Sequence, residues 1–508
     1  MRARGKIKNR AHSGKIILMQ NLGKRNTVVI IGAGVAGCTA GSYLARQGFQ
    51  VKVLEASSKI GGCCGSTAVD GYSFTDGAQY LIYPRILDLV FSQLGFDRSE
   101  ILPLRRATTP QTTHLPDGTA VTVGDNFHLS VENGKIDIAR AQDELKKMVR
   151  KWEPVGKILE DEDVLLSPFS TKKILSKAWN QLPKLARSLE GEFKALFSEP
   201  VFRSAIAAHV LYAGTPLNRL PSISIVALVS ALTDGMALPV GGMGKIPEAL
   251  AHTLRAHGGE IFLNQRVRNI RLGNGCVIGI QTELGDFIEC DLVISTASGM
   301  TTYQSLLEPT AQTRRMVQKV KQTPLSAAAF SIQLGIFNRL EAKSHLNYFV
   351  PFMEKLDQYF SPVHDRADWG YYSIPTLIAP ELAPSGCSVL EYFPVISQGE
   401  PADAWSNERV EQFGCASVEW LQDQFEINIA AKRVRSPREF RDQLSLYEGA
   451  VYGVSPAKGV TGLFAHRSPI QGLYLAGQTT YPGLGVPTAA LSGIHAANGI
   501  LKSRNRRS

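Results

Sequence analysis

Hydrophobic and polar positions follow two different periods near the start of the chain. Residues Thr27–Ile31 form a continuous run of mostly β-branched side chains, which predicts a strand buried on both faces. Apolar positions then recur at helical spacing over Val35–Gln47, which predicts a helix that stops at Gly48. A second strand-like run, Gln50–Leu54, follows at once. Together these elements predict a βαβ unit with parallel strands.

The same order of elements returns near the end of the chain. Residues 472–476 predict a short strand, a glycine-rich turn follows, and Ala489–Ile500 predict an apolar helix. In between, Gly241–Leu250 predict a glycine turn that enters a helix. Five strands are predicted after that helix: Glu260–Leu263, Arg266–Leu272, Val277–Glu283, Phe287–Glu289 and Leu292–Thr296.

The remaining segments are more mixed. Leu115–Gly118 predicts a hairpin turn between two strands, and Glu144–Trp152 and Lys172–Phe197 predict amphipathic helices. Residues 222–240 are the most apolar stretch, but Asp234, Gly235 and Pro239 interrupt it, which argues against a membrane span. Two interpretations of this stretch stay open: a core helix, or one wall of an apolar substrate tunnel.

The net charge of +10 is concentrated at the two ends of the 508-residue chain. Residues 1–26 hold eight Lys or Arg and residues 501–508 hold four more, with no acid in either segment. We expect residues 1–25 to form a solvated, disordered tail. Contact with anionic lipid is the second interpretation, because basic clusters gain about 1 kcal/mol per charge near such a surface. No aromatic or helical reading element accompanies the charge, so we expect no nucleic-acid partner.

Cysteine and histidine usage bounds the chemistry further. The seven cysteines form no CxxC pair, and the ten histidines are dispersed. This pattern predicts reduced thiols and no metal site. The apolar run near Lys15 is too short for a secretory signal. We therefore expect a cytoplasmic protein. The basic tails and the apolar segments near residues 204–240 suit peripheral membrane association.

Gly32, Gly34 and Gly37 lie between the first strand and the first helix in the spacing G-x-G-x-x-G. The first glycine permits a tight turn, the second lets the backbone approach a pyrophosphate, and the third lets the helix pack on the strand. Glu55 ends the second strand 23 residues after Gly32, where an acid accepts hydrogen bonds from adenosine ribose hydroxyls. The phosphates would lie at the N-terminus of the helix. These residues predict a dinucleotide site.

Further glycines extend this predicted site. Gly61 and Gly62 form a second turn without side chains close to the pyrophosphate, and the backbone of Val267 is placed to pair with the adenine edge. At the other end of the chain, Gly477 and Gln478 end a strand and can reach the ribityl and phosphate groups. Gly485 and Val486 open the last helix, whose positive end would point at the isoalloxazine. A second cradle at the C-terminus suits FAD rather than a nicotinamide dinucleotide.

The chain resembles the bacterial-type phytoene desaturase and carotenoid cis-trans isomerase family of FAD-dependent oxidoreductases over nearly all of residues 26–500. The motifs that carry the resemblance are Gly32–Gly37 with Glu55, the double glycine at 61–62, Gly71–Ala78, Gly241–Gly244 and the terminal Pro482–Pro487. Gln478 departs from the pattern, because family members usually have Asp there. Cys63 also departs, because Arg often follows the double glycine.

The resemblance implies an α/β fold in which a Rossmann-like FAD-binding domain of the amine-oxidase-like (GR2) type is interleaved with an α+β substrate-binding domain. We assign residues 26–100, 240–300 and 456–501 to the FAD-binding domain, and residues 101–239 and 301–455 to the substrate-binding domain. The resemblance also implies desaturation or isomerisation of a long apolar polyene or isoprenoid. In desaturation, a C–H hydride would pass to flavin N5. Quinone or oxygen would accept the electrons, and the substrate would be loaded from a membrane surface.

No catalytic triad is evident, and the catalytic residues stay unknown. Gln79, Tyr80 and His495 are weak candidates by position alone. Three other functions stay open: a flavin desaturase or oxidase of another apolar natural product, an amine-oxidase-like enzyme, and a prenyl-binding protein similar to GDP-dissociation inhibitors that has lost catalysis. An amine oxidase would need an aromatic cage beside the flavin, for which Tyr481 offers one wall.

Overall fold

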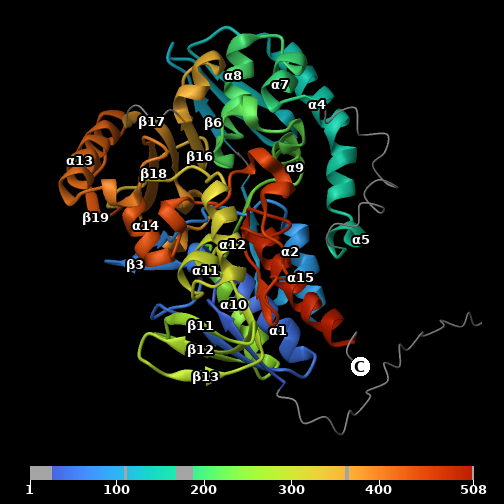
Figure 1. Ribbon diagram of the computed structural model, residues 1–508. Coiled ribbons are helices and arrows are strands. Elements are labelled where there is room, and N and C mark those ends of the chain that lie inside the picture. Colours follow the sequence, from blue (N-terminus) through green and yellow to red (C-terminus); the bar gives the residue numbers. More distant parts are fainter. Residues whose placement is uncertain (1–25, 108–110, 168–186, 361–364, 506–508) are drawn as a thin grey trace, which may run out of the picture.

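The computed structural model describes residues 26–107, 111–167, 187–360 and 365–505 (Figure 1). The predicted tail of residues 1–25 lies outside this part of the chain, and so do residues 172–186 of the helix predicted over residues 172–197. All statements of structure below concern the described residues.

The first sheet is parallel throughout and is built from both ends of the chain. At its centre is β1 (Thr27–Ile31), in which Val28, Val29 and Ile30 are fully buried. A continuous β-branched run fits this position because other elements cover both faces of a central parallel strand. The strands lie in the order β10 (Glu260–Phe262), β2 (Gln50–Leu54), β1, β14 (Leu292–Ser295) and β20 (Leu473–Leu475).

Helices from three distant parts of the chain pack together beside this sheet. Helix α1 (Val35–Arg46) contacts both α10 (Lys245–Ala256) and α15 (Val486–Asn505). The contact between α1 and α15 is close, because a Cβ added at Gly493 would lie 2.4 Å from the carbonyl oxygen of Ala36. The first and last helices therefore belong to one unit, and the predicted α/β Rossmann-like fold is confirmed. The domain boundaries given above stay a prediction.

A small antiparallel sheet extends the same unit at the lower end of Figure 1. It consists of β11 (Val267–Gly273), β12 (Cys276–Thr282) and β13 (Phe287–Glu289). Asn274 and Gly275 join the first two strands with φ of 51° and 77°, the left-handed pair that a two-residue hairpin turn requires. The three strands predicted here are confirmed: the first two have ends shifted by one residue, and Phe287–Glu289 matches as predicted.

The second large sheet has eight strands and is mixed. Its order is β19 (Ile429–Arg435), β15 (Ser331–Ile336), β18 (Ser388–Val395), β17 (Arg366–Ser373), β16 (Leu346–Phe349), β6 (Gln111–His114), β7 (Ala120–Val123) and β8 (Leu129–Glu132). All neighbours are antiparallel except β16 and β6, which pair in parallel across more than 200 residues of sequence. The predicted hairpin turn at Leu115–Gly118 joins β6 to β7 and is confirmed.

Two groups of helices cover this sheet (Figure 1). Four of them share a core with β7 and β16: α4 (Ile138–Leu159), α7 (Leu189–Leu196), α8 (Pro200–Ala208) and α9 (Ile225–Thr233). Helix α13 (Asn407–Gln424) packs on β15, β17 and β19. The shorter elements are β3 (Ser66–Val69), β4 (Tyr72–Thr75), β5 (Leu104–Arg106), β9 (Ala237–Pro239), α2 (Pro84–Leu94), α3 (Arg98–Ile101), α5 (Glu162–Leu165), α11 (Gly299–Ser305), α12 (Ala311–Gln322) and α14 (Pro437–Leu444).

The apolar stretch 222–240 fits both interpretations given above. It forms α9 and then β9, with the break at Asp234 and Gly235. Leu228 and Val229 are buried in the helical core, whereas Ser224 and Ala227 line the large cavity described next. Within the described residues, no helix is both long enough and apolar enough to cross a bilayer.

Candidate active site

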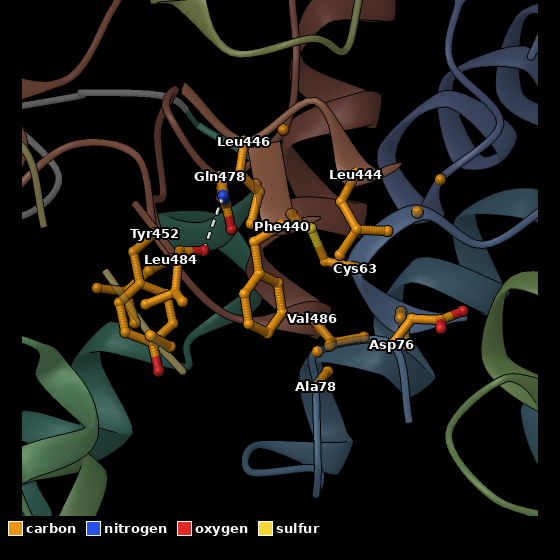
Figure 2. Close-up of a pocket in the computed structure, with 18 of the residues that line it drawn as sticks. Cys63, Asp76, Ala78, Phe440, Leu444, Leu446, Tyr452, Gln478, Leu484 and Val486 are labelled. Carbon is orange, nitrogen blue, oxygen red and sulfur yellow. Dashed lines mark hydrogen bonds between the residues drawn. The ribbon is translucent and has the colours of Figure 1, made fainter. Parts of the chain in front are cut away.

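A cavity of about 1280 Å³ reaches from the C-terminal ends of β1 and β2 to β17 and β18 of the eight-stranded sheet. Sites for single small ligands usually occupy about 300–1000 Å³, so this cavity has room for a cofactor together with a second molecule. Ligands of open α/β sheets bind beyond the C-terminal ends of the strands, which is where this cavity begins. Figure 2 shows part of its lining.

The glycines after β1 take two different roles. Gly32 and Gly34 line the cavity, whereas Gly37 does not. Gly32 has φ of +98°, and a Cβ there would lie 2.5 Å from Oγ1 of Thr296. A Cβ at Gly37 would lie 2.0 Å from the carbonyl oxygen of Gly32, so Gly37 permits α1 to pack against the turn. Of the three glycines, only the first two therefore face the cavity.

Glu55 lies at the end of β2 and lines the cavity beside the glycine turn. Its Oε2 accepts a hydrogen bond of 2.8 Å from the backbone N–H of Ala33, and its Oε1 accepts two of 2.9 Å from Ser57. These donors hold the carboxylate in place against the turn. The second glycine loop is adjacent, because the N–H of Gly61 donates to the carbonyl oxygen of Ala33 at 3.0 Å.

Gly61 and Gly62 also line the cavity, and φ of +128° at Gly61 is a conformation that side-chain-bearing residues rarely adopt. Val267, at the first position of β11, lines the cavity as well. Cys63 follows the double glycine at the cavity wall (Figure 2), and burial raises the pKa of its thiol to about 11, so the thiol stays neutral at physiological pH.

The C-terminal motif supplies the opposite wall. Gly477, Gln478, Gly485 and Val486 all line the cavity. The N–H of Gly477 donates to Oγ of Ser492 at 2.7 Å, and Nε2 of Gln478 donates to the carbonyl oxygen of Val451 at 3.1 Å (Figure 2). Helix α15 begins at Val486, three residues earlier than predicted, so its N-terminus lies at the cavity itself. The structure therefore brings both glycine signatures to one cavity.

The model of the flavin containing amine oxidoreductase family matches residues 35–501. The chain belongs to this family. Its cofactor is FAD, and it is an FAD-dependent oxidoreductase.

Individual relatives of this flavoprotein are distant in sequence. A zeta-carotene-forming phytoene desaturase of Myxococcus xanthus is 25% identical over 491 residues, which cover 92% of each chain. A 4,4'-diaponeurosporene oxygenase of Staphylococcus aureus is 23% identical over 501 residues, which cover 94% of this chain and 99% of the relative. The resemblance to carotenoid desaturases is thereby confirmed. The crystal structure of an oxidoreductase from Methanosarcina mazei shares the fold, with a TM-score of 0.61, 17% identity, and coverage of 94% of this chain and 100% of that one.

The residues of the cavity fit FAD. Helix α1 has no side-chain cap at Gly34, so its first N–H groups are available to an anionic pyrophosphate. A Cβ at Gly34 would meet no protein atom closer than 3.8 Å, so the absence of a side chain there serves the ligand and not the packing of the chain. Which individual residues contact FAD stays a prediction.

The three weak catalytic candidates lie in different places. Gln79 and Tyr80 of the flavoprotein line the cavity, whereas His495 does not. His495 is buried in α15, with its ring centroid 5.5 Å from that of Tyr481 and 5.4 Å from that of His466. Burial lowers the pKa of His495 to about 3. Tyr481 does not line the cavity either, so the aromatic wall expected from it is absent there.

A buried charged cluster beside Gln79 was missed by the sequence analysis. Glu391 of β18 is fully buried and accepts hydrogen bonds of 2.7 Å from the N–H and the hydroxyl of Thr75, and of 2.9 Å from Nε2 of Gln79 and of Gln333. Burial raises the pKa of Glu391, and the hydrogen bonds oppose that shift. One signal was available: Glu391 is the only charged residue in the apolar run 388–395, and a charge there needs buried partners.

Asp76 continues this cluster on the cavity wall (Figure 2). It forms ion pairs with Lys59 at 2.7 Å and with Arg433 at 3.0 Å. Burial raises the pKa of Asp76, but the hydrogen bonds from Lys59 and Thr67 and the charge of Arg433 outweigh burial and lower it overall. Nη1 of Arg435 donates to the carbonyl oxygen of Asp76 at 2.6 Å. The acid is therefore neutralised and does not offer a free charge to a ligand.

The end of the cavity toward β17 and β18 is aromatic. The rings come from separate elements, and Tyr371 of β17 stacks on Phe393 of β18 with centroids 5.0 Å apart and planes 4° apart. Phe440 of α14 and the loop residue Tyr452 lie near Gln478 in Figure 2. The aromatic lining residues are Tyr80, Tyr83, Tyr359, Phe360, Tyr371, Phe393, Phe440 and Tyr452. Such a wall suits an extended apolar or conjugated molecule.

Proposed function

We propose that this flavoprotein oxidises or isomerises a long apolar polyene of the carotenoid class. The observation that carries the proposal is the aromatic end of the cavity, which adjoins the glycine-rich cofactor cradle and is large enough for a second molecule. The two curated relatives support the same substrate class, since their names describe enzymes of carotenoids.

The charges of the cavity favour a polyene over an amine. Three carboxylates line it within the described part of the chain, and each already has partners. Glu55 accepts hydrogen bonds from Ala33 and Ser57, Asp76 is paired with Lys59 and Arg433, and Asp442 accepts from Nε of Arg441 at 2.8 Å. Asp76 and Asp442 are ion-paired, and Glu55 is assigned to the adenosine ribose. An ammonium substrate would therefore lose its hydration without gaining a free carboxylate, which costs several kcal/mol.

Each part of the chain then has a role in holding the reactants. Bound FAD supplies the two-electron redox chemistry. The turn at Gly32–Gly34 and the N-terminus of α1 would hold the pyrophosphate, and Glu55 the adenosine ribose. The N-terminus of α15 presents positive potential at Val486, which favours a developing negative charge nearby. The aromatic walls exclude water and align the chain of the substrate with the redox end of the cavity.

The other functions make different predictions for the purified protein. A non-catalytic prenyl-binding protein would be colourless, whereas the intact glycines at both ends predict a yellow protein. A desaturase or oxidase of another apolar natural product would be yellow and would turn over that product but no carotenoid. An amine-oxidase-like enzyme would bleach on addition of an amine.

The test adds candidate polyenes to the yellow protein anaerobically, in detergent or liposomes. Flavin bleaching with a product two hydrogens lighter supports desaturation. A product of unchanged mass that forms only with pre-reduced flavin supports isomerisation. Turnover of an amine without any effect of polyenes would refute the proposal. Phe393→Ala should reduce polyene turnover, and Phe337→Ala is the matched control because Phe337 is 65% exposed and lies outside the cavity lining.

We also propose that the substrate is loaded from a membrane surface and that quinone or oxygen accepts the electrons. Twelve cations near the two chain ends support the first point, because basic segments are attracted to anionic lipid. Flotation with anionic and neutral vesicles tests it: equal binding to both would refute an electrostatic attraction. Re-oxidation of the reduced protein by a soluble quinone analogue, compared with re-oxidation by air, tests the second point.

A further inference from the structure

The aromatic end of the cavity carries hydroxyl groups that a hydrocarbon cannot use. Tyr359, Tyr371 and Tyr452 line it from three separate segments: residues 353–360, β17, and the loop that precedes the terminal glycine motif. Within the described residues none of these three hydroxyls has a hydrogen-bond partner, yet none is sealed inside the protein. They therefore face the cavity. Tyr80 adds a fourth phenol, whose hydroxyl interacts with that of Tyr348.

These phenols form one cluster. The phenol of Tyr371 lies close enough to Tyr452, Tyr80 and Tyr359 for their charged forms to raise its pKa, in addition to the larger effect of burial. Burial raises the pKa of Tyr452 to about 12. Each hydroxyl is therefore neutral at working pH and can donate a hydrogen bond.

The cluster begins next to the redox end of the cavity. Tyr452 directly follows Val451, whose carbonyl oxygen accepts the hydrogen bond from Gln478. Figure 2 shows the Tyr452 ring beside Leu484 of the terminal motif. Tyr80 follows Ala78 by two residues, and Ala78 lies beside Val486 at the start of α15. The phenols thus extend from the terminal glycine motif toward β17.

Unpaired donors in an apolar cavity select their ligand. A polar group that loses water without gaining a partner costs roughly 1–3 kcal/mol, so a wall built only for hydrocarbon would place phenylalanine at these positions. We propose that the substrate is an oxygen-bearing polyene, whose carbonyl or hydroxyl oxygen accepts hydrogen bonds from this tyrosine cluster near the redox end. A neutral oxygen fits better than a carboxylate, because the phenols carry no charge and the two cations that line the cavity at Asp76, Lys59 and Arg433, are already paired with that acid.

This inference rests on the proposed polyene function and refines its substrate. The same chemistry, a carbonyl oxygen, also occurs in a quinone that would accept electrons from the reduced protein. In the oxidation reaction the two sources differ in when they bind, since the substrate meets oxidised FAD and the quinone meets reduced FAD. They can therefore be separated experimentally.

The test measures binding of a matched set of ligands to the oxidised FAD-loaded protein by the change in flavin absorbance. The ligands share one polyene chain and end in methyl, hydroxymethyl, aldehyde or carboxylate. We expect the hydroxymethyl and aldehyde ligands to bind roughly tenfold more tightly than the methyl ligand, and the carboxylate to gain less. Tyr371→Phe and Tyr452→Phe should remove most of this preference. The methyl ligand should bind these variants at least as tightly as it binds the wild type, because it no longer leaves a hydroxyl without a partner.

Tyr372→Phe is the matched control. Tyr372 is the next residue on β17, points to the opposite face of the sheet, and is buried in another core cluster with 3% exposure. It should keep the full preference for oxygen-bearing ligands.

Three outcomes would overturn the inference. Equal affinity for the methyl and oxygen-bearing ligands would show that the hydroxyls do not select the substrate. If both tyrosine variants still preferred oxygen-bearing ligands over the methyl ligand, other residues would be responsible for the preference. A rise in KM for a soluble quinone in the Tyr variants, with end-group preference intact, would assign the cluster to the electron acceptor. Failure of every polyene to bind would instead refute the proposed function itself.

Discussion

Two glycines of the first turn should respond in opposite ways to the same substitution. Gly34→Ala adds a methyl group that meets no protein atom within 3.8 Å, and the backbone there has φ of −77°, which alanine adopts freely. Gly37→Ala adds a methyl group 2.0 Å from the carbonyl oxygen of Gly32. The first substitution therefore fills the cofactor cradle, and the second separates α1 from the turn.

The expected magnitudes follow from these contacts. Hydrogen bonds to a charged group such as a phosphate contribute about 1.5–3 kcal/mol, so a methyl group that prevents this approach should weaken FAD binding by roughly tenfold to 150-fold. The stability of the FAD-free protein should change little. Gly37→Ala forces a main-chain shift, and overpacking of this kind costs about 1–3 kcal/mol in the free energy of unfolding. Its effect should be present with and without FAD.

Thermal unfolding at increasing FAD concentration separates the two effects. A ligand at 100 times its dissociation constant stabilises the folded chain by about 2.7 kcal/mol, so Gly34→Ala should need correspondingly more FAD to reach the wild-type shift. Flavin absorbance of the dialysed protein gives the occupancy. If Gly34→Ala retained FAD as wild type does, the pyrophosphate would not lie at this turn. If Gly37→Ala melted at the wild-type temperature, the close contact between α1 and the turn would not be needed for stability.

Three further predictions concern protons, the adenosine end and the terminal motif. Burial lowers the pKa of His209 and His495 to about 3 and that of His345 to about 4, so near pH 5 the unfolded chain binds three protons that the folded chain does not. Each histidine should therefore lower the free energy of unfolding by about 1.4 kcal/mol per unit as the pH falls from about 6 toward 4, and the melting temperature should follow. Glu55→Ala should weaken FAD binding roughly tenfold or more, since its carboxylate would accept charge-assisted hydrogen bonds from the ribose; equilibrium dialysis measures this. Gln478→Glu should lower the melting temperature by removing the donor to Val451 and leaving two acceptors in contact, a loss of about 1–3 kcal/mol.

The histidine prediction has a control in the chain. His495→Gln should reduce the acid sensitivity, whereas substitution of the exposed His128 should not; an unchanged pH slope in His495→Gln would contradict the argument. Unaltered FAD affinity in Glu55→Ala would place the ribose elsewhere. For the terminal motif, a Gln478→Glu protein as stable as wild type would show that the bond to Val451 contributes nothing.

Elements with strong local signals could be predicted from the sequence. The strand at Thr27–Ile31 matches the structure residue for residue. A short, continuous β-branched run of this kind strongly favours a buried strand. The helix after it ends one residue earlier than predicted. The hairpin β3–β4 was not predicted, although Asp70-Gly71 at its turn is a typical signal of a two-residue hairpin, with φ of 50° and 86°.

The larger sheet could not be derived in the same way. Four of its strands, β6, β7, β8 and β16, have only four residues each. The parallel pair of β6 and β16 joins residues 111–114 to residues 346–349. No local pattern specifies such a pairing, because the partner of a strand is chosen by packing across the whole domain. The aromatic end of the cavity depends on this sheet. Tyr371 and Phe393 were therefore not among the candidate residues, although they stack on each other in the structure.

The buried charged cluster fixes the position of the cofactor cradle relative to the aromatic wall of the cavity. Thr75 and Asp76 belong to the segment that follows the second glycine loop, whereas Glu391 and Arg433 belong to β18 and β19 of the larger sheet. Removing one partner of a buried pair typically costs about 3–5 kcal/mol, because the other charge is left without a partner. Because breaking these contacts is costly, the cluster keeps the segment at Thr75–Asp76 and the strands β18 and β19 in one fixed arrangement. Gln79 and Tyr80 lie directly after it, so the position of the redox end relative to the tyrosine cluster depends on contacts more than 300 residues apart in sequence.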